Sequence, residues 1–280
     1  MIGAVIVLYN PNLKLLKNNI DSIKKQVDYL ILCDNSDNEK IKTKVVKICQ
    51  NNMIYIDNEG NKGIAYAINR AIEYCKKNKI DWLLTLDQDS VCPSNLIDIY
   101  KKYINYSNVG IICCAVNYND RILDIGKEKY QYVKEHITSA SLVNINICDK
   151  LGGYDENMFI DLVDFEYCYR LREKNYKILM TNEVVLNHNL GDLKIVNIPF
   201  KSIYVPNHNE FRKYFIARNT IYCCKKNKKH ISMLKCIYKL LILQFKILIF
   251  ENNKFIKFKS IFRGIKDGIK IHPTNNNWIR

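Results

Sequence analysis

The chain of 280 residues is long enough to bury a sizeable core, and its 48% hydrophobic and 25% charged residues are typical of one globular domain, with or without an appendage. Its 11 cysteines are scattered and include no Cys-x-x-Cys pair, a pattern that supports neither a disulfide framework nor a zinc site and indicates reduced thiols in a cytosolic protein. The net charge of +15 lies entirely in residues 211–280, which hold 17 Lys and Arg against 2 acids, so we expect that region to meet an anionic surface.

The first 86 residues alternate strand-like and helix-like segments. Met1 leads straight into an apolar run with no basic segment before it, so we expect no signal peptide and a cytoplasmic protein. The alternation of strand-like and helix-like segments predicts an α/β fold with a mostly parallel central sheet and flanking helices. Apolar runs predict strands at 2–8, 29–33, 53–56 and 82–86, and helical spacing predicts helices from 13, over 39–50 and over 64–75.

Polar residues follow each of these strands. They are Asn10, Asp34, the loop 57–63, and Asp87 with Asp89. Parallel sheets bind ligands beyond the carboxyl ends of their strands, so these side chains predict a nucleotide site. Neither a P-loop nor a Gly-x-Gly-x-x-Gly follows the first strand, which argues against a kinase-type NTPase and a dinucleotide dehydrogenase.

Asp87 and Asp89 end the strand at 82–86 with one residue between them. In an extended chain, residues two apart point to the same face, so the two carboxylates project together if the strand geometry persists. Close carboxylates repel unless a cation neutralises them, and a hard divalent cation bound to phosphate oxygens does so. The alternative is a solvated turn at the strand end.

The second half of the catalytic region has a less regular pattern. Pro93 opens a predicted helix over 92–105, and a strand is predicted over 109–116. Residues 117–136 are polar and irregular, and the apolar stretch 138–147 predicts a strand leading into a turn. A Gly-Gly loop at 152–153 precedes a helix predicted to start near Asp161, and residues 176–186 return as a strand.

In their order and spacing, eight segments resemble bacterial family 2 glycosyltransferases of the GT-A fold, most closely the rhamnosyltransferase-like branch. The resemblance spans nearly the whole chain, and each segment is weak alone. The segments are Ala4 to Pro11, Asp34-Asn35-Ser36, Asn61 to Asn69, Asp87-Gln88-Asp89-Ser90, Gly152 to Glu156, Phe159 to Glu166, His188 to Gly191, and Tyr214 to Asn219.

The resemblance implies a donor site built from the strand ends. Tyr9 and Asp34 would line the base and ribose of the nucleotide, and Asn61 and Gly63 would let the backbone approach the sugar nucleotide. Asp87 would contact the ribose and the metal. The metal, Mg²⁺ or Mn²⁺, would bridge the diphosphate and be bound by Asp89, with His188 as a further ligand. Arg218 would bind the diphosphate or the acceptor.

Asp164 falls where the family has its general base, at the second position of an acidic pair whose first position is Val163 here. Asp161 or Glu166 could take over the work of the missing acid. Their other interpretations are structural: Asp161 as the cap of its helix with Asp164 in the first turn, and Glu166 as the partner of Arg170 four residues later. His188 could be an ordinary loop histidine, and Arg218 one more charge of the basic region.

Residues 237–250 are strongly apolar but are interrupted by Lys and Gln, and no run of eighteen apolar residues occurs, so we expect no transmembrane helix. Basic residues flank the segment, which predicts helices lying on an anionic membrane surface. The alternative is a helical hairpin packed on the catalytic domain. No recognition motif supports nucleic-acid binding.

The sequence therefore predicts a GT-A catalytic domain over 1–210 and a basic, amphipathic helical region over 211–280. The predicted enzyme is a metal-dependent, inverting glycosyltransferase that takes a sugar from dTDP-rhamnose or a UDP-sugar. It would act at the inner face of the cytoplasmic membrane, on a lipid-linked or oligosaccharide acceptor of a cell-surface glycan. The alternative is a non-catalytic membrane- or nucleic-acid-binding module on a GT-A scaffold, against which the three aspartates 87, 89 and 164 argue.

Overall fold

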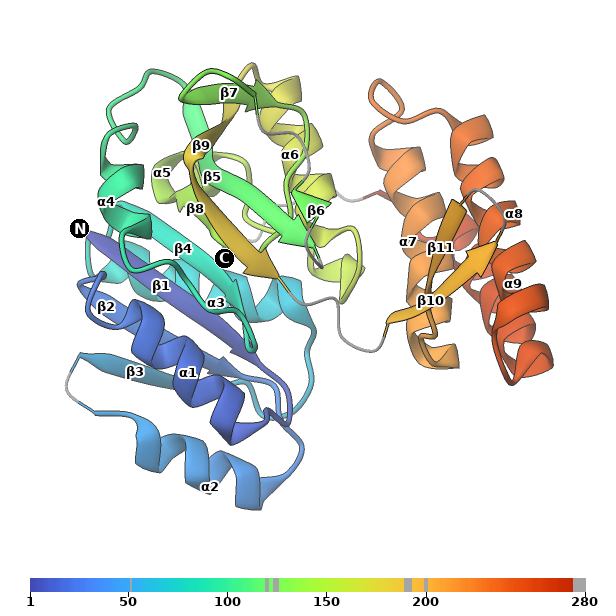
Figure 1. The fold of residues 1–280 in the computed structure, drawn as a ribbon, viewed down its shortest axis with the longest axis horizontal. Coiled ribbons are helices and arrows are strands. Elements are labelled where there is room, and N and C mark those ends of the chain that lie inside the picture. Colours follow the sequence, from blue (N-terminus) through green and yellow to red (C-terminus); the bar gives the residue numbers. More distant parts are fainter. Residues whose placement is uncertain (51, 119–120, 123–125, 189–192, 199–200, 274–280) are drawn as a thin grey trace. The chain divides into compact units, whose positions relative to one another are not determined.

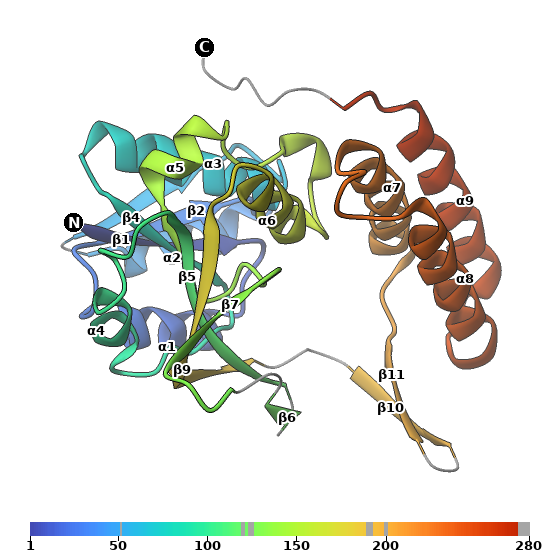
Figure 2. The same cartoon turned by 90° about the horizontal axis from the view of Figure 1, so that it is seen from above.

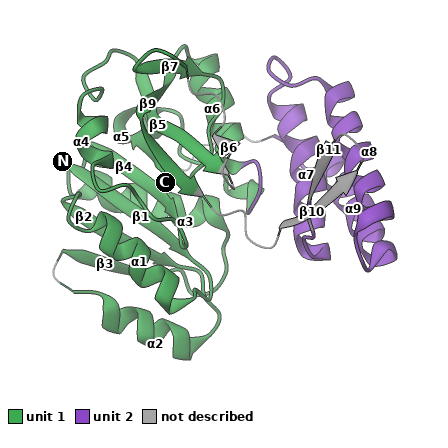
Figure 3. Ribbon diagram, in the orientation of Figure 1, with its two compact units in different colours: residues 1–159, 163–189, 276–280 green, residues 160–162, 190–275 purple. Residues whose placement is uncertain are grey.

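The computed structural model describes residues 1–50, 52–118, 121–122, 126–188, 193–198 and 201–273 (Figure 1). It divides into two compact units (Figure 3). The first is built from residues 1–159 and 163–189, and the second from residues 160–162 and 190–275. The predicted boundary at residue 210, between a catalytic domain and a helical region, stays a prediction.

One mixed sheet forms the centre of the first unit. Its strand order is β3-β2-β1-β4-β8-β5-β9-β7, with β6 paired to β5. The first four strands in this order are parallel, and β8 joins them to the other half by antiparallel pairing with β4 and β5. The strands are β1 (Ile2–Leu8), β2 (Tyr29–Asp34), β3 (Met53–Asp57), β4 (Trp82–Asp87), β5 (Val109–Tyr118), β6 (Arg121–Ile122), β7 (Tyr130–Val133), β8 (Ser141–Asn144) and β9 (Lys177–His188).

Helices cover both faces of this sheet. Figure 2 shows α1 and α4 on one face and α3, α5 and α6 on the other. Strand β1 is almost completely buried because both of its faces are covered, which explains its continuous apolar sequence. The helices are α1 (Leu13–Ile23), α2 (Glu39–Ile48), α3 (Ile64–Lys77), α4 (Leu96–Lys101), α5 (Ile145–Lys150) and α6 (Val163–Glu173), with the 3₁₀ helix η1 (Glu156–Met158).

Side-chain caps start the first two helices. Asn12 accepts hydrogen bonds from the N–H groups of Lys14 and Leu15 at the start of α1, and Asn38 does the same at the start of α2. These amides satisfy backbone donors that a helix end leaves unpaired. The predicted α/β fold with a mostly parallel sheet and flanking helices is confirmed.

Three predicted elements of the less regular region differ in detail. The helix predicted over 92–105 is limited to α4, at 96–101. The strand predicted over 138–147 ends at 144, where the Asn144 side chain accepts from the Ile147 N–H and starts α5. The stretch predicted as irregular contains β7, a short strand at the end of the sheet. Each element is six residues or fewer, too short for its periodicity to be distinctive.

The second unit combines a hairpin with helices. Its described elements are β10 (Leu193–Ile198), β11 (Lys201–Pro206), α7 (Glu210–Lys226), α8 (Met233–Phe250) and α9 (Lys254–Lys270). Helices α7 and α9 approach closely because Gly264 and Gly268 face the backbone of α7: a Cβ on either would clash with the carbonyl oxygen of Tyr214 or Arg218. Small residues at a helix contact allow such an approach.

A buried ionic cluster also holds the helices of this unit. Glu251 accepts from Lys213 Nζ of α7 at 2.6 Å and from Lys257 Nζ of α9 at 2.8 Å. Lys257 also donates to Asn207 Oδ1 at 2.7 Å. All three charged side chains are buried, so each depends on the others for its charge compensation. Within the residues that the structure describes, no helix is long and apolar enough to cross a membrane.

Candidate active site

The parallel strands bring their polar carboxyl ends to one edge of the sheet. In the strand pairing, Leu8 lies beside Asp34, Asp34 beside Asp57, and Val7 beside Asp87. Residues far apart in the sequence therefore meet at the carboxyl ends of β1, β2, β3 and β4. Parallel α/β sheets bind ligands at this edge, and the predicted nucleotide site there stays a prediction.

Asp34 lies at the end of β2 with its side chain fully buried. One carboxylate oxygen accepts the Ser36 N–H at 2.8 Å, and the other accepts the Tyr55 hydroxyl at 3.0 Å. Burial and this hydrogen bond raise the pKa of Tyr55, so the phenol stays protonated and donates. Ser36 in turn accepts the Asn10 N–H at 2.8 Å. Asp34 thus holds the loop after β2 in place, and its contact with the nucleotide stays a prediction.

Tyr9 lies directly after β1, with 46% of its surface exposed. A side-chain hydrogen bond with Asp37 raises the pKa of Tyr9, and Asn61 is a second hydrogen-bond partner of the phenol. The Tyr9 N–H donates to Gln88 Oε1 at 2.9 Å, which joins the ends of β1 and β4. The ring is thereby fixed at the sheet edge with a large exposed surface. Asp37 was not predicted as a site residue, although it directly follows the Asp34-Asn35-Ser36 segment.

Gly63 occupies the N-cap of α3 at φ 91°, a conformation that glycine adopts readily. A Cβ at this position would lie 2.6 Å from the Phe159 carbonyl oxygen. Asn61 Oδ1 accepts the Gly63 N–H at 3.1 Å, and Asn35 Nδ2 donates to the Gly63 carbonyl at 3.1 Å. The structure therefore gives Gly63 a packing reason of its own, beside the predicted approach of a sugar nucleotide.

The extended geometry of β4 ends at Asp87 and does not continue to Asp89. A turn follows, in which the Ser90 N–H donates to the Asp87 carbonyl at 3.2 Å, while Asn19 Nδ2 donates to the same oxygen at 2.7 Å. Asp87 is partly buried and Asp89 is exposed. Strand alternation therefore does not place the Asp87 and Asp89 side chains on one face. A ligand bound by both carboxylates would have to be reached from the two ends of this turn.

Asp164 is the second residue of α6, and its side chain is partly buried. Burial raises the pKa of Asp164 to about 7, and the charge of Asp87 acts in the same direction. The N–H groups of Phe165, at 2.9 Å from Oδ1, and of Thr138 oppose the rise by donating to the carboxylate. A carboxyl group that titrates near neutral pH is suited to accept a proton from a hydroxyl group.

The segment around Thr138 was missed as part of the site. Its carbonyl accepts the Thr85 hydroxyl of β4 at 2.6 Å, and the adjacent Ser139 shares a 2.6 Å hydrogen bond with Ser90. Both serines are buried. These contacts hold the backbone that donates to Asp164 against the turn of Asp87 and Asp89. The signal in the sequence is the run of small residues Thr138-Ser139-Ala140-Ser141, which permits close approach.

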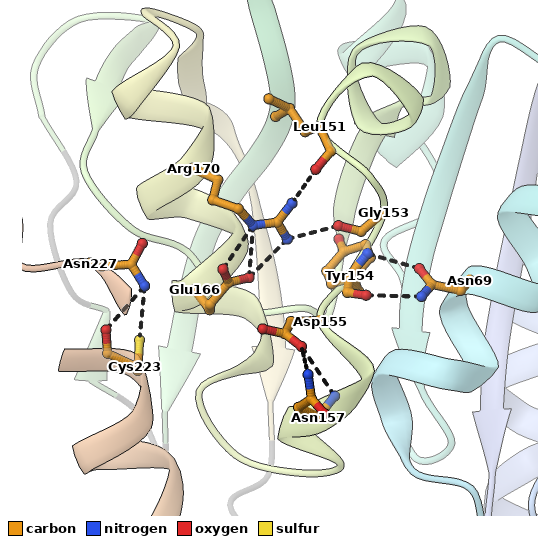
Figure 4. A network of polar contacts seen from close by, with 10 residues as sticks. All are labelled: Asn69, Leu151, Gly153, Tyr154, Asp155, Asn157, Glu166, Arg170, Cys223 and Asn227. Carbon is orange, nitrogen blue, oxygen red and sulfur yellow. Dashed lines mark hydrogen bonds and ion pairs between the residues drawn. The ribbon is translucent and has the colours of Figure 1, made fainter. Parts of the chain in front are cut away.

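Glu166 is fully buried beside Arg170, as the spacing of four residues predicted. Figure 4 shows the Arg170 guanidinium between Glu166 and the carbonyls of Leu151 and Gly153. In the same view, Asn69 of α3 exchanges two hydrogen bonds with the backbone of Tyr154. The network fixes the Gly152–Gly153 loop, so Glu166 has a structural partner.

Asp161 does not cap α6, which begins at Val163, because its φ of 65° differs from the extended backbone of a helix cap. It belongs to the second unit, where Arg212 pairs with its carboxylate at 3.0 Å. Asn219 Nδ2 donates to the carbonyls of Ile160, at 2.6 Å, and Asp161, at 3.0 Å. Arg218, also in the second unit, stacks on Phe215, with its Cζ 4.5 Å from the ring centroid. Its contact with a ligand stays a prediction.

The described residues contain no group of three His, Cys, Asp or Glu side chains that could hold a metal ion by themselves. His188 is the last residue of β9, but its side chain lies outside the described part of the structure. Asp87 and Asp89 carry carboxylate oxygens, the donor type that Mg²⁺ and Mn²⁺ prefer, and their role as metal ligands stays a prediction. Two carboxylates suffice where phosphate oxygens and waters complete the shell.

Comparisons with known proteins agree with this architecture. Residues 4–158 match the model of glycosyl transferase family 2. The chain is 30% identical over 96% of its length to a dTDP-rhamnosyl transferase, RfbF, of Shigella flexneri, of which it covers 95%. The family predicted from the sequence is thereby confirmed.

Two solved structures share the fold at low identity. GalNAc-T7, solved with UDP, GalNAc and Mn²⁺, has a TM-score of 0.59 at 14% identity over 79% of this chain. TarS residues 1–349 of S. aureus, in complex with UDP-GlcNAc, has a TM-score of 0.54 at 12% identity over 97% of this chain and 81% of that one. This chain spans 50% of the GalNAc-T7 chain. The fold, the family model and the near full-length similarity show that the chain belongs to glycosyl transferase family 2 and is a GT-A glycosyltransferase.

Proposed function

We propose that this glycosyltransferase moves rhamnose from dTDP-rhamnose to a hydroxyl group of a growing cell-surface glycan. The observation that carries the proposal is the similarity to a dTDP-rhamnosyl transferase over 96% of the chain. A UDP-sugar is the other donor to test, because the TarS complex holds UDP-GlcNAc.

Asp164 would act as the general base. Its carboxylate accepts the proton of the acceptor hydroxyl as that oxygen attacks the anomeric carbon, and the bond from this carbon to the diphosphate oxygen breaks. The nucleoside diphosphate leaves with the bonding electrons. One base and no nucleophile predict a single displacement with inversion at the sugar carbon. The raised pKa of Asp164, about 7, supports this role.

Asp87 and Asp89 would hold a divalent cation, Mg²⁺ or Mn²⁺, with His188 as a further ligand. The solved GalNAc-T7 structure contains Mn²⁺. When bound, the ion neutralises charge on the leaving diphosphate. The two aspartates contribute an oxygen donor set that leaves coordination sites for the phosphates, which suits an ion shared between protein and substrate.

The donor would lie along the edge formed by β1, β2 and β4. Tyr9 offers an exposed ring for the base, and Asp34 supports the loop around the ribose. Asn61 and Gly63 form the loop before α3, where the backbone would approach the sugar nucleotide. Arg218 would neutralise the diphosphate or contact the acceptor.

The acceptor would be a lipid-linked glycan at the cytoplasmic face of the membrane, with the protein bound there peripherally. The basic second unit supports this location, because anionic headgroups attract clustered lysines and arginines. A lipid-linked acceptor would then be concentrated at the same surface.

A thermal-shift screen of the purified protein tests the donor site. The ligands are dTDP, UDP, GDP and CDP, each with and without Mn²⁺ or Mg²⁺. Ligand binding to the folded state raises the melting temperature by mass action. We expect a metal-dependent shift for dTDP that is lost in Asp89→Asn. No shift with any nucleotide and metal would refute the donor-site assignment.

A further inference from the structure

Helix α8 exposes more of its apolar side chains than it buries. Its inner face consists of Cys236, Leu240 and Ile247. Five large apolar residues follow one another at alternating spacings of four and three, which places them on one outward row of the helix. The outward row of α8 is Leu234, Tyr238, Leu241, Phe245 and Leu248, and between 54% and 78% of each side chain is exposed.

Basic residues line one side of this outward row. At 100° per residue, Lys235, Lys239 and Lys246 fall together between the outward row and the buried face. Ile242 and Ile249 lie between the row and these lysines and widen the apolar surface. The helix therefore presents an apolar strip with a cationic margin, the pattern of a helix that lies in a membrane interface.

Helix α9 repeats the arrangement at a spacing of seven residues. Phe255, Phe262 and Ile269 are 82%, 62% and 59% exposed and lie on one row of the helix. Lys259 and Lys266 lie on the same exposed side. Helices α8 and α9 are side by side within the second unit (Figures 1 and 2). Each of these two neighbouring helices thus exposes apolar and basic side chains together.

The partner of this surface must match both its features. A second copy of the chain would bring the same lysines against one another, which is unfavourable. Nucleic acid would match the charge but offers no extended apolar surface to cover a row of Leu and Phe side chains. An anionic lipid surface offers hydrocarbon for the apolar row and headgroup charge for the lysines at its margin.

We propose that the outward row of α8, with Phe255, Phe262 and Ile269 of α9, docks on the surface of an anionic lipid bilayer. The helix lies in the plane of the interface with Phe245 near its middle and the lysines at headgroup level. The inference deepens the proposed function, since it rests on a membrane-bound acceptor and names the residues that would bring the enzyme to it.

Vesicle flotation of the full chain tests the proposal. The probes are vesicles of phosphatidylcholine alone and of phosphatidylcholine with phosphatidylglycerol. We expect binding to the anionic vesicles that weakens as salt rises. The double variant Phe245→Gln/Leu248→Gln should reduce binding by up to about a hundredfold, since each lost apolar contact with hydrocarbon weakens binding by up to roughly tenfold.

Matched variants on the first unit provide the control. Leu15→Gln/Val46→Gln changes two apolar residues of similar exposure, 47% and 48%, and should bind vesicles as the natural protein does. For charge, Lys235→Gln/Lys239→Gln should weaken binding to anionic vesicles by on the order of tenfold. Lys44→Gln/Lys47→Gln on α2, which removes the same charge, should have little effect.

Three results would overturn the proposal: no flotation of the natural protein with anionic vesicles, equal binding of the α8 and control variants, or a dimer in solution that Phe245→Gln/Leu248→Gln dissociates. Binding of a short DNA duplex that depends on Lys235 and Lys239, without vesicle binding, would assign the surface to nucleic acid. The dTDP-dependent thermal shift reports on the donor site separately, so the two proposals can fail independently.

Discussion

Two carboxylates, Glu251 in the second unit and Asp164 in the first, are withdrawn from water in opposite electrostatic surroundings. In the second unit, Glu251 is buried between Lys213 and Lys257, which compensate its charge at 2.6 and 2.8 Å. In the first unit, Asp164 is withdrawn from water beside Asp87, another acid, and the described residues offer it N–H donors but no ion pair. Burial with cations stabilises a carboxylate, whereas burial beside an anion raises its pKa to the range of a general base.

The apolar side chains show the converse difference. The first unit buries most of its Ile, Leu and Val residues between the sheet and the helices on both faces, whereas α8 and α9 expose many of their large apolar side chains. A carboxylate without a cation and an apolar surface without a covering segment both cost free energy in an isolated protein. Such costs are expected at functional sites, so the comparison directs attention to Asp164 and to the outward row of α8.

Replacing Asp164 should have the largest effect on activity. Asp164→Asn keeps the size of the side chain but removes the proton acceptor, so we expect the rate of sugar transfer to fall roughly 10²–10⁴-fold. The measurement is kcat with dTDP-rhamnose and a glycan acceptor. Asp98→Asn, on α4 with a side chain 78% exposed, is the control and should keep the rate. A similar loss in both variants would contradict the role of Asp164.

Replacing Glu251 should have the largest effect on stability. Glu251→Gln leaves two buried lysines with one neutral partner, and breaking a buried ion pair in this way costs about 3–5 kcal/mol. Glu39→Gln removes an acid that is 82% exposed and also pairs with a lysine, and should cost at most about 1 kcal/mol. Denaturant unfolding of both variants compares the two costs. Equal losses would mean that the cluster of Glu251 is not the stabilising element that its burial indicates.

The sequence predicted the first unit well because its signals are local. Apolar runs define the strands, and the pairing of parallel strands then brings Asp34 and Asp87 to one edge. It failed where the outcome depends on contacts between distant segments. The turn after Asp87 breaks the predicted alternation, and the N–H of Thr138 reaches Asp164 only through the contacts of Thr85 and Ser139.

The second unit was predicted less completely. Residues 237–250 were expected to be helical and to lie on an anionic membrane surface or to pack on the catalytic domain. Periodicity could not say which side of α8 is buried, because apolar residues surround most of the helix. Contacts within the unit decide it: Leu240 and Ile247 pack with Ala217 and Ile261 in one core cluster. Gly264 and Gly268 allow α7 and α9 to pack closely. Single glycines in a helical sequence do not reveal such a contact.

Replacing Gly63 tests whether the loop before α3 tolerates a side chain at this position. Gly63→Ala places a methyl group 2.6 Å from the Phe159 carbonyl in a backbone of φ 91°, so we expect a loss of about 2 kcal/mol or more. Gly3→Ala is the matched control, because its Cβ would meet only side-chain atoms at 3.4 Å or beyond and should change stability by less than about 1 kcal/mol. The measurement is the melting temperature. A Gly63→Ala variant as stable as Gly3→Ala would show that the loop can move away from Phe159.

The pH dependence of Asp164 gives the finest test, because activity and stability should change in opposite directions. The base must be ionised, so with a pKa of about 7 the rate should rise about tenfold between pH 6 and pH 8. A flat rate over this interval would mean that another group is the base.

Stability has the opposite sign. The folded state holds the Asp164 proton up to about pH 7, whereas the unfolded chain releases it near 3.8. Between these values the folded state binds more protons than the unfolded state, so the contribution of Asp164 to stability falls as pH rises. Asp164→Asn cannot titrate and should therefore melt at a higher temperature than the natural protein at pH 8, although its rate of sugar transfer is much lower. A lower melting temperature at pH 8 would mean that the folded state favours the ionised carboxylate, contrary to its position beside Asp87.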